Sequence, residues 1–181
     1  MPRLSPDGTR VALDIRDQDN DIWILDLARQ TLARLTVDPG IDQYPVWTPD
    51  GRRIIYSSSR VGSATMFWQP ADGTGTAEQL SSSTSGQFPI SISPDGARLI
   101  FRENPSSTGF DVMILTLAQR QTEPLIRTTF QENNGQVSPD GRWLAYESNE
   151  SGRYEIYVRP FPNVNSGRWP ISAAGGCEEI T

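Results

Sequence analysis

The chain has 181 residues, a formal net charge of -6, 36% hydrophobic residues, 15 glycines and 14 prolines. The acidic balance argues against nucleic acid as a partner, because the chain as a whole repels a phosphate backbone. The many helix breakers exclude long helices and the aromatic content excludes a disordered chain, so we expect a folded, turn-rich β protein.

The histidine and cysteine counts exclude several kinds of chemistry. Without histidine, neither a Ser-His-Asp or Cys-His catalytic group nor a histidine-containing zinc site can form. The single cysteine, Cys177, cannot form an intrachain disulfide. No apolar stretch approaches the roughly 20 residues of a membrane-spanning helix, and residues 1–5 do not form a signal sequence. We therefore predict no cofactor, no metal, no catalytic residue and no membrane insertion. The sequence does not determine the cellular compartment of the protein. An extracytoplasmic location is compatible with the chain if it is part of a longer parent protein.

A tetrapeptide of the form Ser/Thr-Pro-Asp-Gly occurs four times, and successive aspartates follow at intervals of 43, 45 and 45 positions. The copies stand at residues 5–8, 48–51, 93–96 and 138–141. Proline presets the first corner of a turn, aspartate accepts hydrogen bonds from the nearby backbone, and glycine takes the positive φ that closes a short hairpin. Each copy is therefore predicted to join two antiparallel strands.

The same order of strands is expected around every copy of the motif. One strand precedes it, as at 44–47 and 88–92, and a second follows it with apolar residues at alternate positions. A third strand is predicted at 22–25, 66–68, 112–115 and 156–158, and a short fourth one at 32–36, 78–81, 124–126 and 168–172.

Four strands in each repeat of this length are typical of a β-propeller blade. We therefore predict an all-β fold, a β-propeller built of four-stranded antiparallel blades. The four blades are expected at residues 1–40, 41–85, 86–130 and 131–174, with 175–181 as the start of a further inner strand or a closing tail.

The Ser-Pro-Asp-Gly turn followed by an apolar strand resembles the PD40, or TolB-type WD40-like, repeat over nearly the whole chain. More narrowly, residues 21–27, 67–73 and 149–162 resemble the propeller region that follows the kinase domain of many bacterial serine/threonine kinases. The chain lacks the glycine-rich loop and His-Arg-Asp run of a kinase, and the Gly-x-Ser-x-Gly elbow of the peptidases that carry related propellers. The resemblance implies a non-catalytic interaction module.

The loops that lead from the fourth strand of one blade to the first strand of the next are expected to converge near the channel of a propeller. They carry acidic, amide and aromatic side chains suited to grip a protein, a peptide or a small ligand. We name these the rim residues: Asp42, Gln43, Tyr44, Gln87, Phe88, Glu132, Asn133, Asn134 and Glu178.

Three alternatives to a ligand-binding rim stay open. The loops could be polar as loops generally are, with Tyr44 and Phe88 only wedged between blades. The chain could be a carboxylate- and metal-dependent hydrolase or lyase that uses acids such as Glu132 and Glu178. It could also be a structural fragment of a larger kinase-associated or TolB-like protein.

Two further groups of residues receive structural interpretations. Asp17, Asp19 and Asp21 resemble the start of a calcium loop, but the Gly and Glu of an EF-hand do not follow, so we interpret them as a polar hairpin tip. All five tryptophans are interpreted as core residues between blades: Trp23, Trp47, Trp68, Trp143 and Trp169.

Ring closure predicts a second copy of the chain as a partner. Four blades alone would each subtend about 90°, whereas two chains would form eight blades of about 45°, within the range known for propellers. An open set would leave an apolar blade face at each end. We therefore expect a homodimer that closes an eight-bladed ring, with a monomeric fragment as the alternative.

Overall fold

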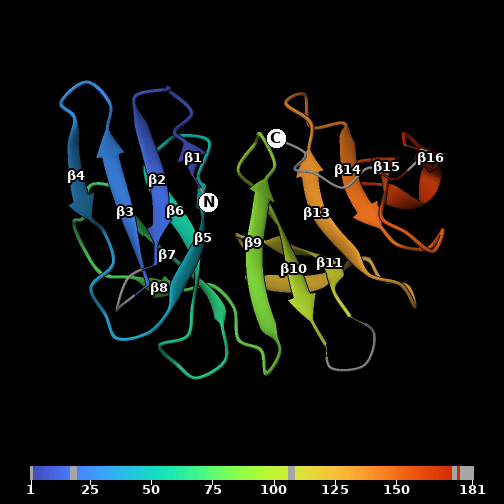
Figure 1. Cartoon of the computed structure of the whole chain (residues 1–181), viewed down its shortest axis with the longest axis horizontal. Coiled ribbons are helices and arrows are strands. Elements are labelled where there is room, and N and C mark those ends of the chain that lie inside the picture. Colours follow the sequence, from blue (N-terminus) through green and yellow to red (C-terminus); the bar gives the residue numbers. More distant parts are fainter. Residues whose placement is uncertain (1, 17–19, 106–108, 173–174, 176–181) are drawn as a thin grey trace. The chain divides into compact units, whose positions relative to one another are not determined.

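The structure is a computed structural model that describes residues 2–16, 20–105, 109–172 and 175. The chain divides into two compact units, one up to Pro89 and one from Ile90. Figure 1 shows that strands make up nearly all of both units. The helical segment of the described residues is a single 3-10 turn at Val164–Ser166, and no described helix is long and apolar enough to span a bilayer.

The strands form four sheets of four strands each, and in each sheet neighbours in sequence are neighbours in space. Blades 1 and 2 consist of β1 (Arg3–Leu4), β2 (Arg10–Ile15), β3 (Asp21–Asp26) and β4 (Thr31–Arg34), then β5 (Asp42–Trp47), β6 (Arg53–Ser58), β7 (Thr65–Pro70) and β8 (Glu78–Gln79). Blades 3 and 4 consist of β9 (Gly86–Ile92), β10 (Arg98–Asn104), β11 (Asp111–Thr116) and β12 (Gln121–Ile126), then β13 (Glu132–Val137), β14 (Trp143–Ser148), β15 (Glu155–Pro160) and β16 (Trp169–Pro170). The predicted all-β fold of four-stranded blades is confirmed.

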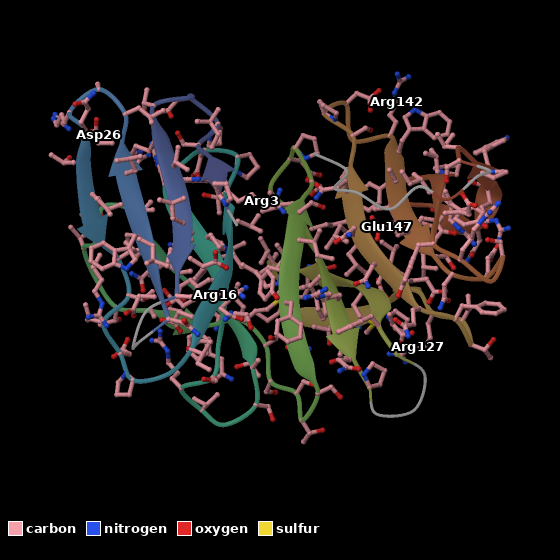
Figure 2. All side chains as sticks on the ribbon, in the orientation of Figure 1. Arg3, Arg16, Asp26, Arg127, Arg142 and Glu147 are labelled. Atoms are coloured by element: carbon pink, nitrogen blue, oxygen red, sulfur yellow. The ribbon has the colours of Figure 1, made fainter. Side chains whose placement is uncertain are left out.

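The repeated tetrapeptide makes the same turn in each blade. The glycine N–H donates to the carbonyl of the Ser or Thr three residues earlier at 2.8–2.9 Å, and the four glycines have φ between 66° and 71°. The Ser or Thr hydroxyl donates to the aspartate carboxylate, which also accepts the N–H two residues further on. The predicted roles of aspartate and glycine are therefore confirmed. Figure 2 labels Arg142, which lies at the last of these turns.

Hydrogen bonding in these turns also fixes the charge of the aspartates. The hydroxyl of Ser5 and the N–H and hydroxyl of Thr9 lower the pKa of Asp7 to about 2. The hydroxyl of Ser138 and the guanidinium of Arg142 lower the pKa of Asp140 to about 2 in the same way. These carboxylates are therefore ionised at any physiological pH.

In the first unit, blades 1 and 2 pack face against face. We call the side of a blade that carries the positions of Ala12 and Ile24 its forward face, and the opposite side its rear face. Ala12 and Ile24 are buried in one core with Ile54, Tyr56 and Phe67 of blade 2. The forward face of blade 1 is therefore covered by the rear face of blade 2.

The second unit repeats this packing with blades 3 and 4. Ile100 and Ile114 occupy the positions of Ala12 and Ile24, as the paired registers of β2–β3 and β10–β11 show. They are buried in one core with Leu144, Tyr146 and Tyr157 of blade 4. Two independent units thus use the same interface between consecutive blades.

The tryptophans do not all belong to these cores. Trp47 is buried, and its indole N–H donates to the carbonyl of Arg3 at 2.8 Å. Trp143 and Trp169 are 41% and 48% exposed, and their rings meet edge to face with centroids 5.8 Å apart. The interpretation of Trp143 and Trp169 as core residues is therefore wrong, because no described residue covers the forward face of blade 4.

Replacing Gly96 by Val should destabilise the protein, because Gly96 has a φ of 71° that a β-branched residue adopts only under strain. We expect a loss of about 1 kcal/mol or more, which corresponds to a fall of a few degrees in melting temperature for a chain of this size. Thermal unfolding followed by circular dichroism measures it. The control is Ala97→Val at the neighbouring exposed position, and equal melting temperatures of the two variants would contradict the assigned turn.

Candidate functional site

Three of the rim residues occupy one equivalent position, the start of the first strand of a blade, and tie that strand to the blade before it. The N–H groups of Asp42, Gln87 and Glu132 donate to backbone carbonyls just before the third strand of the preceding blade, at 2.7–2.8 Å. All three side chains are buried. Their polar groups are therefore turned into the protein, and binding of a ligand by these three stays a prediction.

Asp42 is held by Arg60, a residue that the sequence pattern did not single out. The Arg60 guanidinium donates to Asp42 Oδ2 at 3.1 Å, to Asp38 Oδ2 at 2.5 Å, to Ser58 Oγ at 2.8 Å and to the Tyr56 hydroxyl at 3.1 Å. Arg60 lies in the polar turn after β6, where no sequence periodicity indicates that its side chain is mostly buried. Burial nevertheless raises the pKa of the Asp42 carboxyl, against the opposing effect of the Ser58 and Thr36 hydroxyl groups and of the Arg60 charge.

Gln87 and Glu132 use hydroxyl groups instead of a guanidinium. Ser81 donates to Gln87 Oε1 and Thr128 donates to Glu132 Oε1, both at 2.5 Å. Within the described part of the chain, the second carboxylate oxygen of Glu132 is buried without a hydrogen-bond partner. Burial raises the pKa of Glu132, and the neighbouring carboxylates of Asp111 and Glu150 raise it further.

Beyond these anchors, the first strands of blades 2 and 4 contain the same β-bulge. The strand register shifts between Gln43 and Val46 in β5, and between Asn133 and Gln136 in β13. A bulge inserts an extra residue and redirects the side chains around it. The rim residues Gln43 and Asn133 therefore lie at equivalent places, and both are half-buried.

The bulges hold two rim residues in the left-handed backbone region. Tyr44 has a φ of 58° and Asn134 a φ of 52°. Asparagine is among the residues that adopt this region most readily, whereas for a bulky residue such as tyrosine it is an outlier. Tyr44 therefore carries local backbone strain that the surrounding structure holds in place.

Tyr44 and Phe88 are brought together in the first unit. Their rings meet edge to face, with centroids 5.4 Å apart and an interplanar angle of 71°, and both side chains remain half-buried. The N–H of Tyr44 donates to Asp14 Oδ2 at 3.4 Å. An aromatic pair bordered by a carboxylate thus lies among the rim residues of the first unit, and convergence of the rim loops around a ligand stays a prediction.

The second unit places a cation beside its rim residues. Arg102 donates to Asn133 Oδ1 at 3.5 Å, and its guanidinium carbon lies 4.7 Å from the ring centroid of Phe110. Gly135 lies within the bulge, where the Cβ of any other residue would approach Ile100 Cγ2 to 2.9 Å. Close packing on blade 3 therefore sets where Asn133 and Asn134 lie. Sequence periodicity gave no signal for Arg102 or Phe110.

Two of the candidate sites lie partly outside the described residues. Glu178 is not described, and neither are Asp17 and Asp19 of the suspected calcium loop. Asp21 is described and buried, and its carboxylate accepts from Thr36 and Arg34. Across the described ranges, no group of three or more acidic or cysteine side chains could hold a metal ion.

The fold alone defines the class of the protein, a β-propeller with four-stranded antiparallel blades. A family model for the TolB β-propeller domain, PD40, matches residues 1–170. The chain therefore belongs to the TolB β-propeller family.

Similar proteins agree with this assignment. The Tol-Pal system protein TolB of Helicobacter pylori (strain J99) is 26% identical over 156 residues, which cover 84% of this chain and 37% of that protein. The crystal structure of TolB from Acinetobacter baumannii superposes with a TM-score of 0.76 at 26% identity, over 88% of this chain and 40% of that one.

The same fold also occurs in an enzyme. An oligogalacturonate lyase from Vibrio parahaemolyticus superposes with a TM-score of 0.70 at 13% identity, covering 93% of this chain and 50% of that one. This likeness shows the fold alone. The chain spans between 35% and 52% of the length of the curated relatives that it matches.

Replacing Glu132 by Gln should stabilise the protein at neutral pH. The pKa of the Glu132 carboxyl is higher in the folded protein than in the unfolded chain, where it is near 4.5. The stability that the protonated carboxyl contributes is therefore fully present below pH 4.5 and is lost as the pH rises through the folded pKa. A neutral amide removes the cost of burying the ionised form. We expect a gain of about 1 kcal/mol at pH 7, or a few degrees in melting temperature, that disappears near pH 4.

Melting curves of both proteins between pH 4 and about pH 8 test this expectation. The control is Glu123→Gln, because Glu123 is an exposed carboxylate on β12 of the same unit. A Glu132→Gln protein that is less stable at pH 7, or whose difference from the parent does not change with pH, would contradict the assignment.

Proposed function

We propose that this chain is a non-catalytic interaction module that binds a protein or peptide at the rim of its propeller blades. In a TolB-like protein of greater length it would form part of the propeller. The half-buried rim residues would make the contact, and the buried ones would hold the strands that carry them. Gln43, Tyr44 and Phe88 would act in the first unit, and Asn133 and Asn134 in the second.

The strained conformation of Tyr44 is the observation that supports this proposal most strongly. A β-bulge with an aromatic residue at positive φ lowers stability and persists where the surrounding structure enforces it, and such strain concentrates at binding sites. At this positive φ, the ring of Tyr44 meets that of Phe88 edge to face, and both side chains are half-buried. Aromatic side chains supply a large contact area with little loss of rotamer entropy on binding.

The polar groups around the aromatic pair favour an extended peptide over a purely apolar ligand. Asp14 lies against the Tyr44 backbone, and Gln43 carries an amide that can both donate to and accept from a main chain. In the second unit, Asn133 and Asn134 supply the same kind of amide beside Arg102. Amides next to an aromatic anchor can bind backbone groups and one large side chain at the same time.

We also propose that two copies of the chain pair so that eight blades close a ring. Exposed apolar residues on blades 1 and 4, such as Leu4 and Trp169, support this pairing. Soluble proteins seldom leave extended apolar faces uncovered.

The peptide proposal is tested with Tyr44→Gly, which removes the aromatic ring and also relieves the positive φ. Dodecapeptides would first be selected from a random display library on the immobilised chain, then synthesised and titrated by calorimetry. We expect the variant to remain folded and the affinity for the selected peptides to fall by about tenfold or more, as expected when a central aromatic contact is lost.

The matched control is Gln30→Gly, since Gln30 also has a positive φ, of 53°, but lies at an exposed turn between β3 and β4, away from the rim. It should keep the full affinity. Unchanged binding by Tyr44→Gly, equal losses in both variants, or a library that yields no binding peptide would each argue against the rim as the binding site.

Pairing is tested by multi-angle light scattering of the purified chain. At micromolar concentration the mass should be twice the chain mass of 20.1 kDa. A mass of one chain would refute pairing while leaving the peptide proposal intact.

A further inference from the structure

Three buried residues hold the first strands of blades 2, 3 and 4 at equivalent positions, and each does so with a different kind of contact. We call Asp42, Gln87 and Glu132 the anchor residues. Asp42 accepts a hydrogen bond from the guanidinium of Arg60, and Gln87 is a neutral amide. Glu132 accepts from the Thr128 hydroxyl through Oε1, while its Oε2 has no partner in the described part of the chain. Glu132 is thus a buried acid held by a hydroxyl group.

On the side of blade 3, one arginine faces two acids. Arg127, labelled in Figure 2, donates to Asp111 Oδ2 at 2.6 Å and lies 3.8 Å from Glu103 Oε2. Asp111 is fully buried, and its Oδ1 also lacks a hydrogen-bond partner among the described residues. The carbonyl of Phe110, the residue before Asp111, accepts the N–H of Glu132 at 2.7 Å. Glu132 therefore begins beside two acids that a single guanidinium already serves.

The described arginines of blade 4 are also paired with other acids. The strand registers place Glu132 and Glu155 in one cross-strand row, and Arg153 pairs with Glu155 at 2.8 Å. Arg168 forms an ion pair with Glu150. Within the described ranges, no arginine therefore forms an ion pair with Glu132.

The charges around Glu132 are out of balance. The group consists of the acids Glu103, Asp111, Glu132, Glu150 and Glu155 and the arginines Arg127, Arg153 and Arg168. Glu147 is opposite Asn133 in the register, so it lies on the other face of the sheet. An ionised carboxylate buried without a cation is costly, and nearby carboxylates add repulsion. A proton on Glu132 removes one of these charges and turns one of its oxygens into a donor.

We infer that Glu132 is a proton-dependent anchor, whose neutral form fixes the start of β13 and whose ionisation releases this end of the strand. The inference deepens the proposed function and rests on it for the effect on a ligand, because the rim residues Asn133 and Asn134 follow directly. Asn134 keeps a φ of 52° in a bulge that begins one residue after the anchor. Release of Glu132 would therefore loosen the rim of the second unit.

The direction of the pH effect follows from the environment of the carboxyl. Burial and the carboxylates of Asp111 and Glu150 raise the pKa of Glu132 above its ordinary value of 4.5. The anchor is therefore fully formed below pH 4.5 and is lost as the pH rises through the pKa of the folded protein. The second-unit rim is expected to be ordered in acid and looser at higher pH.

The anchor of blade 3 supplies an internal reference for the neutral form. Gln87 is 1% exposed, as Glu132 is, and its Oε1 accepts from the Ser81 hydroxyl as Glu132 Oε1 accepts from Thr128. An amide, like a protonated carboxyl, carries one acceptor oxygen and a donor group. Blade 3 thus has an anchor that does not titrate, so the pH dependence should be confined to β13 when the two strands are compared.

Amide hydrogen–deuterium exchange of β13, read by mass spectrometry between about pH 5 and about pH 8, tests the inference. Rates are divided by those of the unfolded chain at the same pH, which removes the intrinsic pH dependence of exchange. In the parent, protection of β13 should fall by about tenfold or more as the pH rises, as expected for a shift of about one pKa unit. Glu132→Gln should keep full protection throughout, and Glu123→Gln, at an exposed position, should behave as the parent.

A reciprocal variant moves the effect to another blade. Gln87→Glu places an acid at the anchor of blade 3, so protection of β9 should become dependent on pH while it remains high at the acidic end. This variant separates a titrating anchor from a general weakness of β13. Protection of β9 that is independent of pH in folded Gln87→Glu would contradict the role assigned to the anchor position.

Other outcomes also decide the matter. Protection of β13 that is constant with pH in the parent, an equal pH profile in Glu132→Gln, or an equal loss of protection in β10 and β11 would overturn the inference. The exchange result needs no ligand, so it stands whether or not a peptide binds at the rim. Release of β13 without any change in the affinity of the selected peptides would argue against binding at Asn133 and Asn134, and not against the anchor.

Discussion

The need to cover both faces of each sheet determines how this chain folds. A blade of four short strands cannot bury an apolar face by itself, so each blade depends on a neighbour. In the first unit, Ala12 and Ile24 of blade 1 meet Tyr56 and Phe67 of blade 2, and blades 3 and 4 repeat the arrangement. Hydrophobic burial therefore acts between blades. The rear face of blade 1 and the forward face of blade 4 keep exposed apolar residues such as Leu4 and Trp143.

The sequence predicted the blades well because their turns are specified locally. The aspartate and glycine of each Ser/Thr-Pro-Asp-Gly copy need no distant contact to adopt their conformation, as the bonds around Asp95 and the φ of Gly96 show. Period-2 alternation then determines which side chains share a face. The sequence pattern does not show which blade faces stay uncovered. Trp143 and Trp169 lie in strands as Trp47 does, so all three were interpreted as core residues, but only Trp47 is buried.

The rim was only partly predictable, since loop position does not determine where a polar side chain turns. Gln87 and Gln43 are both amides near the start of a first strand, yet Gln87 is buried against Ser81 while Gln43 stays half-exposed. The difference depends on a hydroxyl group in the preceding blade. The positive φ of Tyr44 depends on a bulge, which no sequence period signals. Its recognition needed backbone coordinates.

The strained backbone conformation of Tyr44 depends on the packing between blades. The conformation of Tyr44 persists because buried residues flank the bulge on β5, with Asp42 before it and Val46 and Trp47 after it. Anything that loosens the packing of blade 2 on blade 1 would let the bulge relax and the aromatic pair separate. The blade interfaces therefore do more than hold the fold together, because they also preserve the geometry that a ligand would meet at the rim.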